Sequence, residues 1–510
     1  MIAVFNFGSQ FAHLIARRVR DLGVKAEIVP FDISAEKLGK LNPHGIIFSG
    51  GPASVLEKGS PRPDKKIFEL GLPILGICYG HQVIAHMLGG KVVKGKHREF
   101  GKETLNLKKK SQIFAGLLKK QEVWFSHGDQ VSKLPKNFTA TAGTSGCASA
   151  AYQSSTQKIF GIQFHPEVTH TARGREIISN FIFSICNAPK NWKIGSVSKT
   201  IIAELKNTIG SAHSIVGISG GVDSLVAATL LHKAIGNKLH AVFVDTGLLR
   251  KDEVKSVAAV LRKRNFKHLY VIDAQELFLN KLSGVVDPEK KRKIIGHTFI
   301  EVFENVIKTK LKKYPVKYFA QGTIYPDRIE SAHTSKHASK IKSHHNLTLP
   351  KKFSFKIVEP LKDFYKDEVR KLGALLKLPY DMLWRHPFPG PGLAIRIVGE
   401  ITDERLSILR EADDIFIEEL KRTGEYGKIW QAFAVLLPLK TVGVMGDART
   451  YEYILALRAV NSVDGMSADW HKMPSKLLER ISSTIVGRVR GINRVLYDIT
   501  QKPPATIEYE

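Results

Sequence analysis

The chain has 510 residues, 43% of them hydrophobic, and a formal net charge of +29. This length predicts two to four domains with apolar cores of their own. No run of 18 apolar residues occurs, and the start reads as a strand rather than a signal peptide, which argues against a membrane protein and against a secreted protein. Three cysteines in so long a chain argue against a disulfide framework, and we expect a cytoplasmic location.

The positive charge is distributed over short runs of basic residues, such as residues 108–110, 290–293 and 308–313. A charge excess of this size is compatible with nucleic-acid binding or with the attraction of polyanionic small substrates. No basic stripe is interleaved with aromatic residues. We therefore interpret most of these runs as solvated surface and expect no specific nucleic-acid partner.

The first part of the chain reads as an α/β domain in which short strands and helices alternate. Apolar runs predict buried strands over residues 2–5, 46–48 and 74–77. Apolar residues at helical spacing predict a helix over residues 11–22. We expect this first domain, a doubly wound parallel sheet, to span residues 1–188.

A Gly-x-Cys-x-Gly pattern, made by Gly76, Cys78 and Gly80, follows the strand at residues 74–77. Small flanking residues permit a sharp strand-to-helix turn that exposes a nucleophile, and the positive end of the helix favours a thiolate. His165 and Glu167 follow another apolar run. A histidine can move the proton and a carboxylate can orient it, so the pattern predicts a Cys-His-Glu triad.

A second parallel sheet is predicted downstream, in a domain that we expect to span residues 189–384. Its strands are the apolar runs at residues 215–218, 242–244 and 269–272, and a long basic helix is expected over residues 294–314. Strands that alternate with helical segments are typical of a doubly wound sheet.

A glycine-rich loop lies between the strand at residues 215–218 and a helix. We call it the phosphate loop: Ser219, Gly220, Gly221, Val222, Asp223 and Ser224. Backbone N–H groups and a helix N-terminus at one point suit a phosphate. The carboxylate of Asp223 would repel a phosphate unless a divalent cation lies between them, so the loop predicts Mg²⁺ at Asp223. The Gly-Lys-Ser/Thr of a Walker A loop is missing, which argues against transfer of a terminal phosphoryl group.

The last part, residues 385–510, reads as a small α+β domain. It opens with three prolines and two glycines within residues 385–392, which exclude regular structure. Its predicted elements are strands at residues 394–398, 433–437 and 441–445 and a helix at residues 404–420.

The first domain resembles class I glutamine amidotransferases. The resemblance rests on the Gly-x-Cys-x-Gly turn at Cys78, which we call the cysteine elbow, on the segment His165-Pro166-Glu167 and on Gly50-Gly51-Pro52. The resemblance implies that Cys78, His165 and Glu167 release ammonia from glutamine through a thioester. It also implies oxyanion N–H groups on Gly51 and Tyr79. Contacts to glutamine are implied for Gln82 and for the segment Ser126-His127-Gly128-Asp129.

The phosphate loop resembles that of N-type ATP pyrophosphatases, and the chain as a whole resembles glutamine-hydrolysing GMP synthetases. The whole-chain resemblance rests on Phe7-Gly8-Ser9-Gln10, Gln321 to Asp327, Lys342 to Asn346, Arg385 to Gly392 and Lys502 to Glu508. It implies that xanthosine 5'-monophosphate, Mg²⁺-ATP and glutamine are converted to GMP, AMP, pyrophosphate and glutamate by a homodimer. The last domain would pair the subunits.

The same resemblance implies further binding residues. Lys366 would add positive charge at the pyrophosphate, and Val244 and Asp245 would hold the adenosine. The positions implied for xanthosine monophosphate are Arg292, Gln431, Arg494, Lys502, Ile507 and Glu508.

Two other interpretations remain at this point. The chain could be another ATP-pyrophosphatase amidotransferase, such as a glutamine-dependent NAD synthetase. It could also be a basic nucleic-acid-binding or regulatory protein built on inactive enzyme domains, although the intact triad and phosphate loop argue against this.

Overall fold

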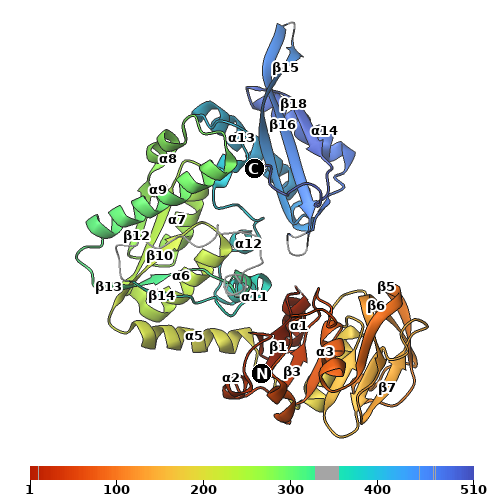
Figure 1. The fold of residues 1–510 in the computed structure, drawn as a ribbon. Coiled ribbons are helices and arrows are strands. Elements are labelled where there is room, and N and C mark those ends of the chain that lie inside the picture. Colours follow the sequence, from red (N-terminus) through yellow and green to blue (C-terminus); the bar gives the residue numbers. More distant parts are fainter. Residues whose placement is uncertain (10, 328–354, 447, 463–464, 466) are drawn as a thin grey trace. The chain divides into compact units, whose positions relative to one another are not determined.

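The computed structural model describes residues 1–9, 11–327, 355–446, 448–462, 465 and 467–510, and it describes residues 96–98 and 445 by their backbone alone. The chain divides into two compact units, Met1–Val197 and Ser198–Glu510 (Figure 1). We call them the first and the second unit and describe each by itself. The three-domain boundaries that follow from the sequence stay predictions.

The first unit is built on a nine-stranded sheet with the order β2-β1-β3-β4-β9-β8-β7-β5-β6. Five strands are parallel: β1 (Ile2–Asn6), β2 (Ala26–Pro30), β3 (Gly45–Phe48), β4 (Ile74–Ile77) and β9 (Ile159–Ile162). Strands β1, β3, β4 and β9 are buried at every residue, as expected for strands covered on both faces. The helices beside them are α1 (Phe11–Asp21), α2 (Ala35–Lys40) and α3 (Tyr79–Met87).

An antiparallel extension completes this sheet. It consists of β5 (Lys91–Leu107), β6 (Lys120–Lys133), β7 (Phe138–Gly143) and β8 (Ala151–Ser154), and α4 (Gly174–Ser179) follows β9. The predicted alternation of short strands with helices is therefore wrong for residues 91–162. The long pair β5–β6 takes its place, and it bears the segment of Ser126 and His127.

The second unit contains a five-stranded parallel sheet with the order β12-β11-β10-β13-β14. The strands are β10 (His213–Ile218), β11 (Leu239–Asp245), β12 (Leu269–Asp273), β13 (Val316–Ala320) and β14 (Lys356–Val358). The chain leaves β10 toward β11 and later returns to the other side of β10 with β13. This reversal creates a switch point between β10 and β13, where open α/β sheets bind ligands at the carboxyl ends of their strands.

Helices accompany this sheet: α5 (Ile194–Ile209), α6 (Val222–Ile235), α7 (Glu253–Lys263), α8 (Gln275–Leu282), α9 (Pro288–Thr309), α11 (Lys366–Leu375) and α12 (Tyr380–Leu383). The predicted long basic helix is α9, but it begins and ends earlier than expected. Asp287 caps it by accepting from the backbone N–H of Lys290, and Pro288 takes the first helical position.

The C-terminal part of the second unit holds a four-stranded sheet. Its elements are α13 (Asp403–Arg422), β15 (Gln431–Met445), β16 (Ala448–Asn461), β17 (Asp469–Trp470), α14 (Ser475–Arg488) and β18 (Ile492–Asp498). The two strands predicted at residues 433–437 and 441–445 are one strand, β15, with an irregularity between Leu437 and Lys440. The predicted α/β fold class, with parallel sheets and a smaller α+β part, is confirmed.

The strand predicted at residues 394–398 is wrong. A 3-10 helix, η5 (Gly392–Ile395), takes its place, and Ile397 alone pairs with Leu436 in a single β-bridge. Gly392 has a φ of +65°, and a Cβ there would lie 2.3 Å from the carbonyl oxygen of Leu248. The backbone of Gly392 therefore passes close to Leu248, and the chain forms a 3-10 turn here instead of an extended strand.

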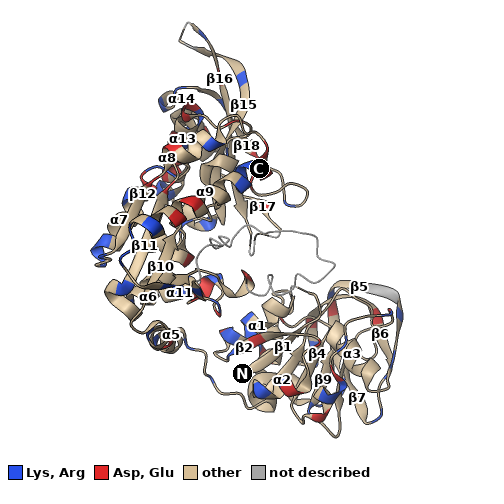
Figure 2. Ribbon diagram, turned by 60° about the vertical axis from the view of Figure 1, so that its left-hand side comes forward, with Lys and Arg blue, Asp and Glu red and all other residues tan. Residues whose placement is uncertain are grey.

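Lys and Arg residues are spread over helices and strands of both units (Figure 2). No helix within the described ranges is long and apolar enough to cross a bilayer.

Candidate active sites

Cys78 lies on a sharp turn between β4 and α3. Its backbone has φ 52° and ψ −105°, a strained conformation for a residue with a side chain. A Cβ on Gly76 would lie 2.6 Å from the backbone carbonyl of Gly80, and a Cβ on Gly80 would lie 2.5 Å from the carbonyl oxygen of Phe48. Both glycines are therefore needed for the turn, as expected for a nucleophile elbow.

His165 and Glu167 form a buried pair beside this cysteine. The His165 Nδ1 and Glu167 Oε1 atoms are 2.7 Å apart, and both side chains are almost fully buried. Gly50 lies beside both catalytic candidates, because a Cβ on it would be 3.2 Å from His165 Cε1 and 3.7 Å from Cys78 Cβ. The ring of Phe11 covers the imidazole at 4.4 Å.

The electrostatics of His165 favour its charged form. Burial is the largest single influence and lowers the pKa, but the charges of Glu167 and of the Cys78 sulfur, with hydrogen bonds to both, together raise the pKa of His165 well above its ordinary value. The arrangement thus favours an imidazolium at His165.

Gly51 and Tyr79 lie together at the elbow. A Cβ on Gly51 would lie 2.8 Å from the carbonyl oxygen of Phe7 and 3.4 Å from the Tyr79 ring. The Tyr79 hydroxyl donates to the carbonyl of Pro61 at 2.8 Å. The backbone N–H at the start of α3 is then the group that Tyr79 can offer to an oxyanion.

The predicted glutamine contacts converge near the elbow. The backbone carbonyl of Ser126 lies 3.7 Å from the Cys78 sulfur. The carbonyl of Asp129 accepts from Gln82 Nε2 at 2.8 Å and contacts His127 Nδ1 at 2.9 Å. The other ring nitrogen of His127 contacts Glu99 Oε2 at 3.0 Å, and burial lowers the pKa of His127.

Glu99 is a residue that sequence reasoning missed. It is buried on β5, and it also accepts from the hydroxyl of Thr144 at 3.0 Å. Its partners lie 28 and 45 positions away in the chain, and no local pattern marks it.

The phosphate loop joins β10 to α6. Gly221 is the N-cap residue, and the helix begins at Val222. The two serines hold the loop closed, because the Ser219 N–H donates to Ser224 Oγ at 3.2 Å and Ser224 Oγ donates to the Gly221 carbonyl at 3.0 Å. Backbone N–H groups at the start of α6 remain available for an anion.

A buried ion pair supports the loop from behind. Gly220 has a φ of 76°, and its carbonyl accepts from Arg385 Nη1 at 2.8 Å. Arg385 Nη2 in turn pairs with Glu253 Oε1 at 2.7 Å. The sequence marked Arg385 as part of a family segment without this role, and Glu253 was missed.

Asp223 lies in the first turn of α6 and pairs with Lys366, the first residue of α11, through its Oδ2 atom. The other oxygen, Oδ1, is buried and has no hydrogen-bond partner within the described residues. A Cβ on Gly322, just after β13, would lie 3.2 Å from the Asp223 backbone, so the switch point is at this loop. An orphaned carboxylate oxygen fits a divalent cation bound chiefly by phosphate oxygens.

Val244 and Asp245 end β11, the neighbour of β10. Asp245 accepts from the Gly247 N–H at 3.0 Å and from Gln275 Nε2 at 3.2 Å, and Val244 is buried. These two residues and the phosphate loop therefore share the carboxyl edge of the sheet.

Gln431 and Glu508, far apart in the chain, are brought into contact. Gln431 Nε2 donates to Glu508 Oε1 at 2.7 Å. Ile507 is buried in an apolar cluster that includes Phe433. Arg396, which sequence reasoning did not select, binds the same carboxylate.

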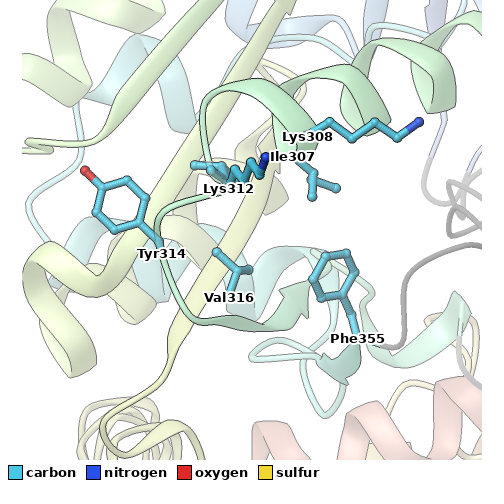
Figure 3. Close-up of a pocket in the computed structure, with 7 residues that line it drawn as sticks. Ile307, Lys308, Lys312, Tyr314, Val316 and Phe355 are labelled. Atoms are coloured by element: carbon cyan, nitrogen blue, oxygen red, sulfur yellow. The ribbon is translucent and has the colours of Figure 1, made fainter.

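A surface pocket of about 440 Å³ lies elsewhere on this unit. It is lined by Ile307, Lys308, Leu311, Lys312, Tyr314, Val316 and Phe355, and Lys308 and Lys312 project from the chain above Val316 and Phe355 (Figure 3). Val316 begins β13, so the pocket is at the amino edge of the sheet, whereas the phosphate loop is at the carboxyl edge.

Known proteins are similar to this chain over its whole length. A GMP synthase (glutamine-hydrolyzing) of Aquifex aeolicus (strain VF5) is 55% identical over 510 residues, which cover 100% of this chain and 99% of that protein. A protein of the same description from Carboxydothermus hydrogenoformans is 52% identical over 510 residues, with the same shares. The chain belongs to the glutamine-hydrolysing GMP synthase family.

Three family profiles match successive parts of this GMP synthase family member. They are described as glutamine amidotransferase class-I (residues 3–185), NAD synthase (residues 195–291) and GMP synthase C terminal domain (residues 418–509). The NAD synthase profile covers the phosphate loop together with Val244 and Asp245. The full-length relatives are GMP synthases, so the match does not favour an NAD synthetase.

Three other nucleotide positions expected for a GMP synthase, Arg292, Arg494 and Lys502, lie in other surroundings. Lys502 Nζ donates to the carbonyl of Gly465 at 2.7 Å, and Arg292 Nη1 pairs with Glu289 on its own helix at 2.6 Å. Arg494 is exposed on β18. Within the described ranges no hydrogen bond or ion pair joins these three side chains to Gln431 or Glu508.

Proposed function

We propose that this protein aminates xanthosine 5'-monophosphate to GMP at the expense of ATP, with ammonia taken from glutamine. Membership in the GMP synthase family supports the reaction. The observation that carries the proposal is that one chain holds two different strand–turn–helix sites. One presents a thiol beside a buried imidazole, and the other presents backbone N–H groups for a phosphate.

In the glutaminase half, the Cys78 sulfur attacks the carboxamide carbon of glutamine. The N–H groups of Gly51 and Tyr79 stabilise the oxyanion, and His165 gives its proton to the departing ammonia. Water then attacks the thioester, His165 takes up the proton of this water, and glutamate leaves. Glu167 keeps the imidazole oriented through both steps.

In the synthetase half, the oxygen on purine carbon 2 attacks the α-phosphorus of ATP, and pyrophosphate leaves into the phosphate loop. Ammonia then adds to carbon 2 and AMP departs with the oxygen. Adenylylation is needed because an unactivated oxygen is a poor leaving group. Lys366 and the N–H groups of the loop neutralise the charge that develops on pyrophosphate.

Magnesium fits the free Oδ1 of Asp223. When it is bound, Mg²⁺ supplies charge neutralisation between this carboxylate and the pyrophosphate oxygens. Asp223 and the phosphate oxygens would hold it, and Lys366 fixes the other carboxylate oxygen.

The nucleotide contacts complete this proposal. Val244 and Asp245 hold the adenosine at the carboxyl edge of the sheet. Glu508 accepts from a purine N–H, with Gln431 and Ile507 beside it. Arg292, Arg494 and Lys502 are assigned to the monophosphate because their charge suits it. Within the described residues, no hydrogen bond or ion pair joins these three side chains to Glu508, which is assigned to the base at the other end of the nucleotide.

We also assign a cytoplasmic location and a homodimer. All three cysteines are unpaired and buried, which suits a reducing compartment. The arm formed by β15 and β16 exposes Val442, Val444 and Tyr451 at 60%, 74% and 67% of their surfaces, and Val442 lies opposite Tyr451 in register. An exposed apolar patch marks an association surface. The double variant Val442→Lys, Val444→Lys should be monomeric in sedimentation analysis. A monomeric wild-type protein would contradict the assignment.

A single assay tests the function. Purified protein is given xanthosine 5'-monophosphate, Mg²⁺-ATP and glutamine, and GMP and AMP are quantified. Equal amounts of both are expected. AMP formation with deamido-NAD but no GMP from xanthosine monophosphate would favour the NAD synthetase alternative. Salt-sensitive RNA binding without turnover would favour the nucleic-acid-binding alternative.

A further inference from the structure

Arg396 is fully buried, and within the described residues its side chain donates hydrogen bonds to one partner. Its Nε donates to Glu508 Oε2 at 3.1 Å and its Nη2 donates to Glu508 Oε1 at 3.0 Å. The Arg396 side chain is 0% exposed, whereas that of Glu508 is 18% exposed. The arginine thus lies behind a carboxylate that keeps access to the surface. A bidentate pair of this kind fixes the plane of the carboxylate as well as its position.

The guanidinium group is itself held rigidly. It stacks on the rings of Phe433 at 4.1 Å and Phe388 at 5.0 Å. Its backbone is also fixed, because its carbonyl accepts from the N–H of Leu436 at 2.9 Å and its N–H donates to Leu393 at 3.0 Å. Two rings and a bridge to β15 leave the side chain little freedom.

A third hydrogen bond reaches the same carboxylate. Gln431 Nε2 donates to Glu508 Oε1 at 2.7 Å and to the carbonyl of Pro387 at 3.2 Å. An ionised carboxylate offers about four acceptor positions, and three are now occupied. The remaining acceptor position is on Oε2, and its direction is set by the contacts of Arg396 and Gln431 to the carboxylate.

Anchoring of the C-terminal residues does not need Arg396. Arg458 donates to the carbonyls of Thr500 and Thr506, and the buried Lys291 pairs with Glu510. These cations hold the chain on both sides of Glu508. The contact of Arg396 is confined to the carboxylate group, which separates it from the other two.

We propose that Arg396 is the positioning residue for nucleotide recognition: it holds the carboxylate of Glu508 oriented so that the remaining lone pair accepts an N–H of the purine base of xanthosine monophosphate. The inference rests on the proposed function, which wild-type turnover tests on its own. It predicts that binding of the nucleotide substrate depends on Arg396, whereas binding of ATP does not.

The test uses ammonia as the nitrogen donor, so that the glutaminase site plays no part. In Arg396→Gln the KM for xanthosine monophosphate should rise about ten- to hundredfold while the KM for ATP stays within about twofold. Arg396→Lys keeps a charge but loses the bidentate contact, and it should show an intermediate increase. Arg405→Gln is the matched control, because Arg405 bonds the Glu400 carbonyl, stacks on Tyr453 and does not bind Glu508.

A double-mutant cycle with Glu508→Gln separates positioning from a structural role. If Arg396 acts through Glu508, the double variant should bind the nucleotide as tightly as the single variant that binds it less well. Additive effects in the cycle would overturn the proposal, and so would equal increases in the KM values for ATP and xanthosine monophosphate. If Arg396→Gln does not fold, the same comparison is made with Arg396→Lys, for which an unchanged KM for the nucleotide overturns the proposal. A wild-type protein without GMP synthesis would instead refute the proposed function.

Discussion

The cysteine elbow and the phosphate loop are built alike and used differently. Each follows a buried parallel strand and opens a helix, β4 to α3 in one unit and β10 to α6 in the other. Each contains one residue with positive φ. In the elbow this residue is Cys78 itself, at 52°, and in the phosphate loop it is Gly220, at 76°.

The choice of this residue decides the chemistry. When the residue with positive φ bears a side chain, the turn pushes that side chain outward, and the site presents a nucleophile. When it is a glycine, nothing projects and the backbone N–H groups are presented instead. The same local topology therefore presents a thiol in one unit and backbone N–H groups in the other, and we propose that the first is a covalent site and the second an anion site.

The largest expected effect comes from removing the thiol. Cys78→Ala should lower glutamine-dependent GMP synthesis by at least about 10³-fold, because no other described group can form the thioester. Ammonia-dependent synthesis should stay within about twofold, since the phosphate loop belongs to a separate unit. Both rates are measured as GMP formed per enzyme. Equal loss of the two activities would show that the sites do not divide the reaction as proposed.

Removing the carboxylate of the loop should affect both nitrogen donors. Asp223→Ala should lower glutamine-dependent and ammonia-dependent synthesis together by about 10²- to 10³-fold, because charge at the leaving pyrophosphate is no longer balanced. The control is Asp381→Ala, which removes an exposed carboxylate from α12. Retained ammonia-dependent activity in Asp223→Ala would contradict the role assigned to this residue.

A smaller effect is expected when the glycine of the loop is replaced. In Gly220→Ala the new Cβ would lie 2.7 Å from Glu253 Oε1, which displaces the ion pair with Arg385. We expect the KM for ATP to rise about tenfold with both nitrogen donors. Gly236→Ala is the matched control, because its φ is 55° but its Cβ would meet no atom within 4 Å.

Both glycine variants should lose about 1–2 kcal/mol of stability from the positive φ alone. Only Gly220→Ala should change the KM for ATP. The same change in Gly236→Ala would mean that backbone strain, and not the shape of the loop, governs binding.

Acid should weaken the second unit through His240. Burial and the neighbouring His268 and His213 lower the pKa of His240 from 6.5 to about 4. The unfolded chain then binds the proton more tightly than the folded chain. The contribution of His240 to the free energy of unfolding is therefore fully present above pH 6.5 and is lost as the pH drops toward 4. Between pH 7 and pH 5 the loss due to this residue should be about 1–2 kcal/mol.

Urea unfolding at several pH values, followed by hydrogen exchange in each unit, measures this effect. His240→Gln should flatten the pH dependence of the second unit and leave that of the first unchanged. An equal slope in wild type and variant would exclude His240 as the source. The first unit holds two opposed histidines: the raised pKa of His165 favours the folded state as the pH falls, whereas His81, whose pKa is lowered to about 3, weakens it as His240 does.

The parts of both sites that depend on adjacent residues could be predicted from the sequence. The glycines around Cys78 and the order of residues in the phosphate loop follow from local backbone requirements, and the structure places both motifs between strand and helix as expected. Apolar runs also identified β1, β3, β4, β10, β11 and β12 among the parallel strands, since strands covered on both faces have few polar positions, whereas β2, β13 and β14 were not predicted.

The parts that depend on distant residues could not be predicted. Arg385 contacts Gly220 across 165 positions, and Arg396 contacts Glu508 across 112. The basic run at the start of α9 shows a different difficulty. One residue corresponds to about 100° of rotation on a helix, so Lys291 is buried against Glu510 while its neighbour Arg292 turns to Glu289.

The backbone of Cys78 has a consequence for how this protein can be stabilised. A glycine would adopt φ 52° without strain, so Cys78→Gly should yield a first unit that is more stable than Cys78→Ala, although both lack the thiol. The proposed nucleophile therefore occupies a position that selection for stability alone would give to another amino acid. Screens for heat resistance that do not also demand glutamine hydrolysis are expected to lose the nucleophile.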